Sequence, residues 1–287
     1  MNKLRFILLL IISSICHCAI GQDIGDTITL RPANVAITFD AGGVRNLDTY
    51  LSPIRYSGYH VGLSFEHLRA TSFRPEKWIN QVATTIGYDN IENPVRNNTM
   101  HQLLATVSWN MSRRYRNVIT RNLDFFVGSH LGFDGGITYN PNNSNNLCSP
   151  QVFLNAGVTG MVVYRFKLGK LPITARYQPT IPVIGGYYLP DYDQSFYEIY
   201  LGNYRDAMNF SWWGNRFDME NLVTADFHLG SAALRIGYRN NVTTLWKNNI
   251  SVQRTVHAFV LGISWESIRY NPRKGLAKNY KTASSIY

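Results

Sequence analysis

The sequence predicts an all-β fold, an antiparallel up-and-down transmembrane β-barrel of about ten strands, and counts of about eight to twelve also fit the pattern. Three observations predict it. Apolar and polar residues alternate along many segments, tight turns alternate with Asn-rich connections, and none of the proposed strands contains a lysine. A strand places successive side chains on opposite faces, so each of these segments has one apolar face and one polar face.

The first residues have the features of a secretory signal peptide. Lys3 and Arg5 precede an apolar run over residues 6–12, and Ala19 and Gly21 supply the small residues of a cleavage site. The alternative is a membrane anchor, but the fully apolar part is shorter than the roughly 20 residues that a spanning helix needs. We therefore expect Sec-type export followed by cleavage before Gln22.

We expect the chain to consist of three parts. We expect a signal peptide over 1–21, the barrel over 22–268 and a basic, solvated periplasmic tail over 269–287. Cys148 would be the one remaining cysteine, so no intrachain disulfide can form. The formal charge would fall from +10 to 10 − 2 = +8. Such a charge raises the question of nucleic acid, but export argues against that partner.

The alternation is clearest in QVFLNAGVTGMVVYRF, residues 151–166, where every second residue from Val152 is apolar or glycine. It recurs in nine other segments, which we take as strands. Their apolar phases are Val35, Ile37, Phe39; Tyr59, Val61, Leu63, Phe65; Val82, Thr84, Ile86, Tyr88; Leu103, Ala105, Val107, Trp109, Met111; Leu123, Phe125, Val127, Leu131, Phe133; Ile173, Ala175, Tyr177, Ile181, Val183; Val223, Ala225, Phe227, Leu229; Leu234, Ile236, Tyr238; and Phe259, Leu261, Ile263, Trp265.

The connections indicate which end of the barrel faces the cell exterior. KLGKLP at 167–172 and HLGSAA at 228–233 are tight, whereas NIENPVRNN, YNPNNSNNLCSP, the stretch 187–221 and NNVTTLWKNN are longer and rich in Asn. Short periplasmic turns and long extracellular loops are typical of outer-membrane barrels. An even strand number also leaves both termini in the periplasm.

A soluble barrel or sandwich would turn its apolar face inward. The polar phase here consists of Gly, Ser, Thr, Gln, Asn, His and Arg, and it resembles a lumen more than a water-exposed surface. The apolar phase includes tyrosines and tryptophans near strand ends, as an interfacial aromatic girdle requires. We therefore expect the outer membrane as the location and outer-membrane lipid as a partner.

The segment YLSPIRYSGYHVGLSFEHLR, residues 50–69, the signal ending in Gly-Gln and the Asn-rich loops together resemble an uncharacterised family of outer-membrane β-barrel proteins of Bacteroidetes type. The resemblance implies the location and the fold. It implies no activity and no catalytic residues.

The sequence shows no phosphate-binding loop, CxxC pair or HExxH motif, and its histidines are dispersed, so we expect no metal and no cofactor. The glycine-rich pieces DAGG at 40–43 and FDGG at 133–136 precede no helix, and we expect loop or bulge geometry there.

A lipid hydrolase or deacylase is the enzymatic alternative. His101 and Ser129 both fall on the apolar phase of neighbouring strands, but at different depths, which argues against a hydrogen bond of ~3 Å between them. His60 and Ser64 share a face but lie four residues apart, roughly 13 Å along a strand. We therefore favour a protein that is not an enzyme.

The favoured function is binding of an extracellular ligand or protein partner through the aromatic-rich stretch 187–221, in which Tyr192, Tyr197, Trp212 and Trp213 are the candidate contacts. Aromatic side chains anchor interfaces and stack on planar ligands. Two alternatives are that these rings pack together to cap the barrel, and that the protein is a narrow diffusion pore.

The last candidate site is a charge network that fills the lower lumen. Four acids and four arginines lie on the inward phase of the periplasmic half: Glu66, Asp124, Asp226, Glu266, Arg165, Arg176, Arg235 and Arg239. Charges in a narrow interior are stable only when they are paired. We therefore expect a lumen closed by its own side chains.

Overall fold

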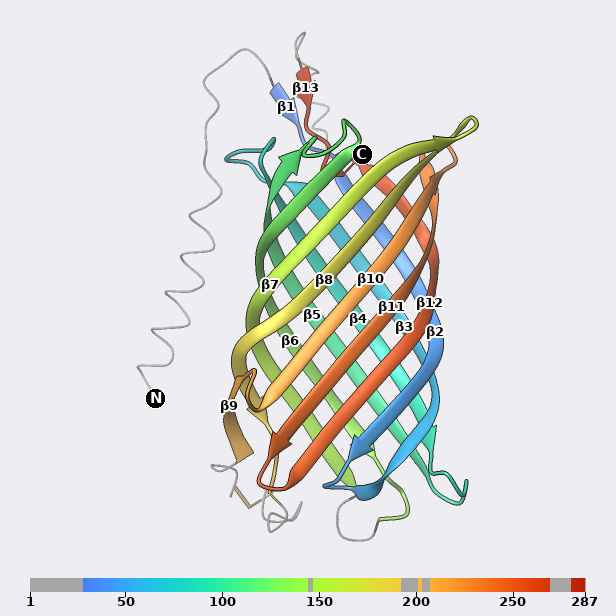
Figure 1. Ribbon diagram of the computed structural model, residues 1–287, viewed down its shortest axis with the longest axis vertical. Coiled ribbons are helices and arrows are strands. Elements are labelled where there is room, and N and C mark those ends of the chain that lie inside the picture. The colour runs from blue at the N-terminus through green and yellow to red at the C-terminus, as the bar shows by residue number, and fades with distance from the viewer. Residues whose placement is uncertain (1–27, 144–146, 192–200, 203–206, 269–279, 287) are drawn as a thin grey trace.

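Ten long strands close into one antiparallel barrel in the computed structural model, which describes residues 28–143, 147–191, 201–202, 207–268 and 280–286 (Figure 1). The strands are β1 (Ile28–Leu30), β2 (Ala33–Asp48), β3 (Ser52–Ala70), β4 (Trp78–Glu92), β5 (Thr99–Arg116), β6 (Leu123–Tyr139), β7 (Cys148–Leu168), β8 (Leu171–Tyr188), β9 (Met208–Trp212), β10 (Arg216–His228), β11 (Ala232–Lys247), β12 (Ile250–Ser267) and β13 (Tyr280–Thr282). Within the described residues, no helix is long and apolar enough to span a membrane.

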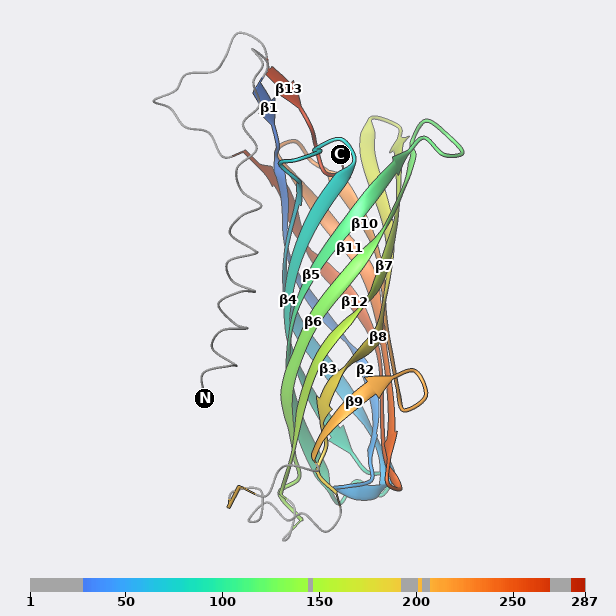
Figure 2. The same ribbon diagram turned by 90° about the vertical axis from the view of Figure 1, so that its left-hand side faces the viewer.

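Each long strand pairs with its neighbours in sequence, and β12 pairs with β2. The barrel is completed where Ile173–Thr180 of β8 pair with Glu220–Phe227 of β10. The predicted fold class and the strand number are therefore confirmed. β1 and β13 form a separate parallel pair at one end of the barrel, which we call the terminal end; the opposite end is the loop end (Figures 1 and 2).

The alternation predicted from the sequence sets which face each side chain occupies. Large apolar residues such as Leu63, Val127 and Leu154 point outward and are 56%, 61% and 64% exposed. Polar residues of the other phase, including Gln81 and Asn110, point inward and are buried. This arrangement is the reverse of a soluble barrel, so that alternative is wrong.

A short additional strand, β9, was not expected. It pairs with Ile184–Tyr188, the loop-end part of β8, so β8 has β10 as its partner toward the terminal end and β9 toward the loop end. A register shift lies just before this change, between Ala156 and Gly157 of β7. Pro182 lies at the same place and has no N–H to donate to a neighbouring strand.

Several connections differ from the expected pattern because the strands run further than the alternation indicated. NNVTTLWKNN is mostly β11, and its turn consists of Asn248 and Asn249, both with positive φ. The glycine-rich pieces are also strand rather than loop. At Gly42 in β2, a Cβ would lie 1.9 Å from the carbonyl oxygen of His257, so the barrel wall needs glycine there for close contact between strands.

The C-terminal segment, residues 280–286, differs from the solvated tail expected there. Ala283, Ser285 and Ile286 are buried, and Ile286 packs among inward-facing residues of the terminal end. This basal cluster consists of Leu68, Ile79, Phe126, Met161, Val163 and Ile286. The segment therefore fills the terminal end of the lumen.

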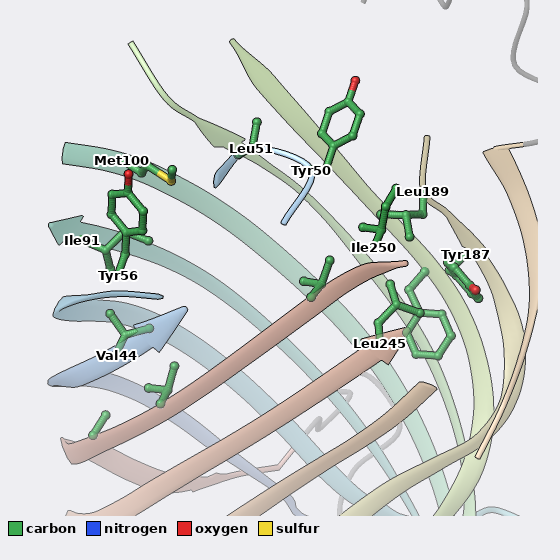
Figure 3. Close-up of a cluster of buried hydrophobic side chains, with 14 residues drawn as sticks. Val44, Tyr50, Leu51, Tyr56, Ile91, Met100, Tyr187, Leu189, Leu245 and Ile250 are labelled. Atoms are coloured by element: carbon green, nitrogen blue, oxygen red, sulfur yellow. The ribbon is translucent and has the colours of Figure 1, made fainter. Parts of the chain in front are cut away.

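A second apolar cluster fills the loop end of the lumen, and we call it the cap cluster (Figure 3). It consists of Val44, Tyr50, Leu51, Tyr56, Ile91, Met100, Phe153, Tyr187, Leu189, Leu245, Ile250, Val252, Val256 and Ala258. Between the basal and cap clusters the interior is polar and charged.

Candidate functional site

Six of the eight predicted lumen charges form two separate groups. In the lower network, Arg176 donates to both oxygens of Glu66, at 2.6 and 3.0 Å. Arg235 donates to Glu66 at 2.6 Å and to both oxygens of Asp226 at 2.6 and 2.7 Å. Gln81 adds a hydrogen bond to Glu66. Because these residues come from β3, β4, β8, β10 and β11, the network ties opposite walls of the barrel together.

A second group lies nearer the terminal end. Arg165 donates to Asp124 at 2.8 Å, and Arg114, which the sequence analysis did not select, donates to the same oxygen at 2.6 and 2.9 Å. The two arginines also donate to the backbone carbonyls of Ser284 and Ile286, each at 3.0 Å. These bonds fix the C-terminal segment in the basal part of the lumen.

Two predicted members have other partners. Glu266 accepts a hydrogen bond from Ser284 at 2.6 Å and contacts none of the predicted arginines. Arg239 lies nearer the loop end, where it pairs with Asp40 at 2.9 Å and with Glu220 at 3.4 Å. It belongs to a middle network of Asp40, His60, Asp89, Arg239 and Arg254 that sequence reasoning missed.

His60 is the centre of the middle network. Its Nδ1 lies 2.5 Å from Asp89 and its Nε2 lies 3.0 Å from Asp40. Arg254 pairs with Asp89 at 2.8 Å. Both ring nitrogens are therefore engaged by carboxylates, and neither remains to serve as a base toward a third group. The signal that could have revealed this network is the shared inward phase of Asp40, His60 and Asp89 on three adjacent strands.

A cavity of about 220 Å³, lined by both polar and apolar side chains, adjoins these networks inside the barrel. Its walls include His130, Asp134 and Asn155, and the ring nitrogens of His130 lie 2.7 Å from Asn110 Oδ1 and 3.0 Å from Asn155 Oδ1. Water molecules can occupy the part of the cavity that these polar groups line. Within the described residues, no group of His, Cys, Asp and Glu is arranged to hold a metal ion.

The two catalytic candidates, His101 and Ser129, are not brought together. His101 pairs in register with Tyr139, whereas Ser129 pairs with Met111, ten residues from His101 along β5 and so roughly 33 Å away. His101 Nδ1 instead bonds the hydroxyl of Tyr88 at 2.8 Å. Ser64 bonds Thr85 and Arg239, and not His60. No serine–histidine pair is formed by these candidates.

The aromatic stretch contains both buried and exposed rings. Tyr187 is buried in the cap cluster. Phe210, Trp212 and Trp213, which we call the β9 strip, are 65%, 56% and 57% exposed. The candidates Tyr192 and Tyr197 lie outside the described residues.

The chain matches one sequence family over residues 6–274. It belongs to this family, which is described as Protein of unknown function (DUF3316). An uncharacterised family was expected, and the Bacteroidetes type stays a prediction. No curated protein matches the chain.

Three solved structures illustrate what the fold is similar to. The outer membrane protease OmpT from Escherichia coli shares 8% identity, with 82% of this chain and 97% of that chain covered and a TM-score of 0.47. The β domain of the Bordetella autotransporter BrkA shares 9%, with 82% and 99% covered and a TM-score of 0.39. The translocator domain of the autotransporter NalP from Neisseria meningitidis shares 9%, with 90% and 92% covered and a TM-score of 0.38.

Proposed function

We propose that the protein is a non-enzymatic outer-membrane barrel, exported with a cleaved signal peptide, that binds an extracellular ligand or protein partner through the β9 strip. In this proposal the terminal end faces the periplasm and the loop end faces the exterior. The apolar outer wall and the polar interior support insertion in a bilayer, because an apolar exterior of this extent is stable only against lipid.

The observation that carries the binding role is the exposure of three large aromatic side chains on a short accessory strand. Phe210 and Trp212 are two residues apart and lie on the same face of β9, and Trp213 follows in the turn. The backbone of this turn is held by Asn215, which accepts from Trp212 N–H at 2.9 Å and donates to the Phe210 carbonyl at 2.8 Å. Rigid, exposed aromatics anchor interfaces at a small entropic cost.

The interior supports a binding role over the two alternatives. Among the described residues, ion pairs and two apolar clusters occupy the lumen, and this filling argues against free diffusion. The hydrolase alternative needs a serine near His101, and Ser129 is far from it.

A binding experiment on a glycan array tests the proposal, because exposed tryptophans stack on sugars as on other planar ligands. Nanodisc-embedded wild-type protein should bind at least one glycan class, and Trp212→Ala/Trp213→Ala should bind it at least about tenfold more weakly. The matched control is Trp246→Ala, since Trp246 is 63% exposed on β11. Heat-modifiable migration of all three proteins on gels shows that they are folded.

Two outcomes would count against the β9 strip as a binding surface. One is glycan binding that is equal for the wild type and the double variant. The other is strong quenching of Trp212 and Trp213 fluorescence by brominated lipid, which would place the strip in the bilayer. Loss of a lipid-modifying activity in His101→Ala would favour the hydrolase instead.

A further inference from the structure

A groove on the outer wall of the barrel, near the loop end, is a second surface that the proposed function does not use. It has a volume of about 900 Å³ and lies over β12, β2, β3 and the connection after β4. Its lining includes Gly43, Arg45, Arg55, Glu92, Arg96 and His257.

The charge of the groove is positive. Arg45, Arg55 and Arg96 line it together with a single acid, Glu92. All three arginines are exposed, and none is in an ion pair with any residue that the structure describes. In the lumen, by contrast, Arg176 and Arg254 are paired with carboxylates. The groove therefore presents guanidinium groups that are available to an anion.

The position of the groove follows from the strand register. Thr255, Arg45, Ser57 and Glu92 form one row across β12, β2, β3 and β4. The next outward-facing row toward the terminal end contains His257, Gly43, Tyr59 and Asn90. Beyond this second row, toward the terminal end, the outward-facing rows are apolar.

These apolar rows mark the part of the wall that meets hydrocarbon. Phe259, Ala41, Val61 and Tyr88 form the first, and Leu261, Phe39, Leu63 and Ile86 form the second. Tyrosine and histidine side chains are typical of the boundary between hydrocarbon and lipid headgroups. The row that contains Arg45 lies next to this boundary on its loop-end side, which is where the headgroups of the nearer leaflet would lie.

The groove is also built to keep its shape. Arg55 on β3 donates to Gln253 on β12 at 2.9 Å, across the intervening strand β2. Arg96 has a positive φ of 58°, and its N–H donates to the Asn93 carbonyl at 3.0 Å. The Asn93 side chain in turn accepts from the N–H groups of Asn97 and Asn98. At Gly43, an added Cβ would meet only the Gly58 carbonyl oxygen at 4.0 Å, so this glycine leaves the floor open.

We propose that the groove binds the phosphate-bearing headgroup of an anionic lipid of the adjoining leaflet. With the loop end outside the cell, that lipid is a phosphorylated glycolipid of the outer leaflet. Guanidinium groups bind phosphate oxygens in bidentate fashion, and three of them match a headgroup with more than one phosphate. A lipid is favoured over a soluble phosphate because its acyl chains would lie along the apolar rows on the terminal-end side of the arginines.

Native mass spectrometry of the detergent-purified, full mature protein tests the proposal. The probes are diphosphoryl lipid A, the same lipid after enzymatic removal of its phosphates, and inorganic phosphate. Wild-type protein should retain diphosphoryl lipid A and release the dephosphorylated lipid. Arg45→Gln/Arg55→Gln/Arg96→Gln should weaken retention by at least about tenfold, since the charge-assisted bonds are lost.

Two further variants separate charge from shape. Arg113→Gln is the matched control, because Arg113 is an exposed, outward-facing arginine at the opposite end of the wall, and it should change retention by less than about twofold. Gly43→Phe fills the floor of the groove without altering charge, and it should weaken retention as the triple variant does.

Equal retention of diphosphoryl lipid A by wild type and triple variant would overturn the proposal, as would equal retention of the dephosphorylated lipid. Retention of inorganic phosphate alone, with competition against lipid A, would identify a soluble anion as the occupant. All substituted side chains are on the surface, so folding is checked by heat-modifiable migration; the triple variant decides if Gly43→Phe does not fold.

Discussion

Glu66 is the residue on which the lower network depends, because it is shared by Arg176 and Arg235. Replacing it with Gln keeps the shape but leaves the buried Arg176 without its carboxylate. Breaking a buried pair in this way costs about 3–5 kcal/mol, because one charge remains in a poorly solvated interior. We therefore expect Glu66→Gln to lower the free energy of unfolding by this amount, measured by urea titration in lipid vesicles.

A matched control for this change is Glu76→Gln, because Glu76 pairs with Lys281 on the surface and both side chains are more than half exposed. Its unfolding free energy should equal that of the wild type within error, since solvent screens such a pair. If the two substitutions had the same effect, the lower network would not be what stabilises the barrel.

The limits of sequence reasoning are also visible at single residues. The lower-network residues were found because acids and arginines stood out on a phase that was otherwise uncharged. Asp40 and His60 lie on the same inward phase, but Asp40 begins a glycine-rich stretch that is typical of a loop, and His60 has no other histidine next to it in the sequence. Pairing across adjacent strands depends on register, which a single strand pattern does not define.

Among the elements, the ten long strands could be predicted because a wall between lipid and a polar interior imposes a strict period of two. β9 could not, since five residues in a long connection give too short a pattern. The docking of the C-terminal segment was also missed. Its basic residues indicated a solvated tail, whereas its contacts are made by backbone carbonyls and by Ile286, which charge counting does not consider.

The C-terminal segment should be an integral part of the barrel. Ile286 is 1% exposed in the basal cluster, and replacing a buried Ile with Ala costs about 2–5 kcal/mol. Ile286→Ala should therefore lower the unfolding free energy by that amount in urea titrations, whereas Val95→Ala, at a residue 76% exposed, should change it little.

A labelling experiment tests the same docking without relying on stability. In a mature chain that carries Cys148→Ala, a cysteine introduced by Ile286→Cys should react slowly with a maleimide, and one introduced by Val95→Cys should react quickly. Equal rates at the two positions would show that the segment does not occupy the lumen.

For the whole molecule, the arrangement of layers along the barrel axis decides whether ions can pass. From the terminal end, these layers are the basal cluster, the lower network, the middle network with its adjoining cavity, and the cap cluster. A barrel of about eight strands is filled by side chains, and open porins need about sixteen. Ten strands therefore leave a narrow lumen, and here side chains from both walls occupy it.

We therefore expect the wild-type protein to be nearly silent in planar bilayers. Removing residues 280–287 should not open the barrel either, because the lower network and the cap cluster still block the lumen at two other levels. If the layers act in series, a variant that lacks this segment and also carries Glu66→Ala and Arg176→Ala should likewise stay nearly silent, because the middle network and the cap cluster remain intact. Single-channel recordings at both polarities measure this. Large, stable conductance from the wild type would contradict the closed lumen and would place a diffusion pore ahead of the binding function.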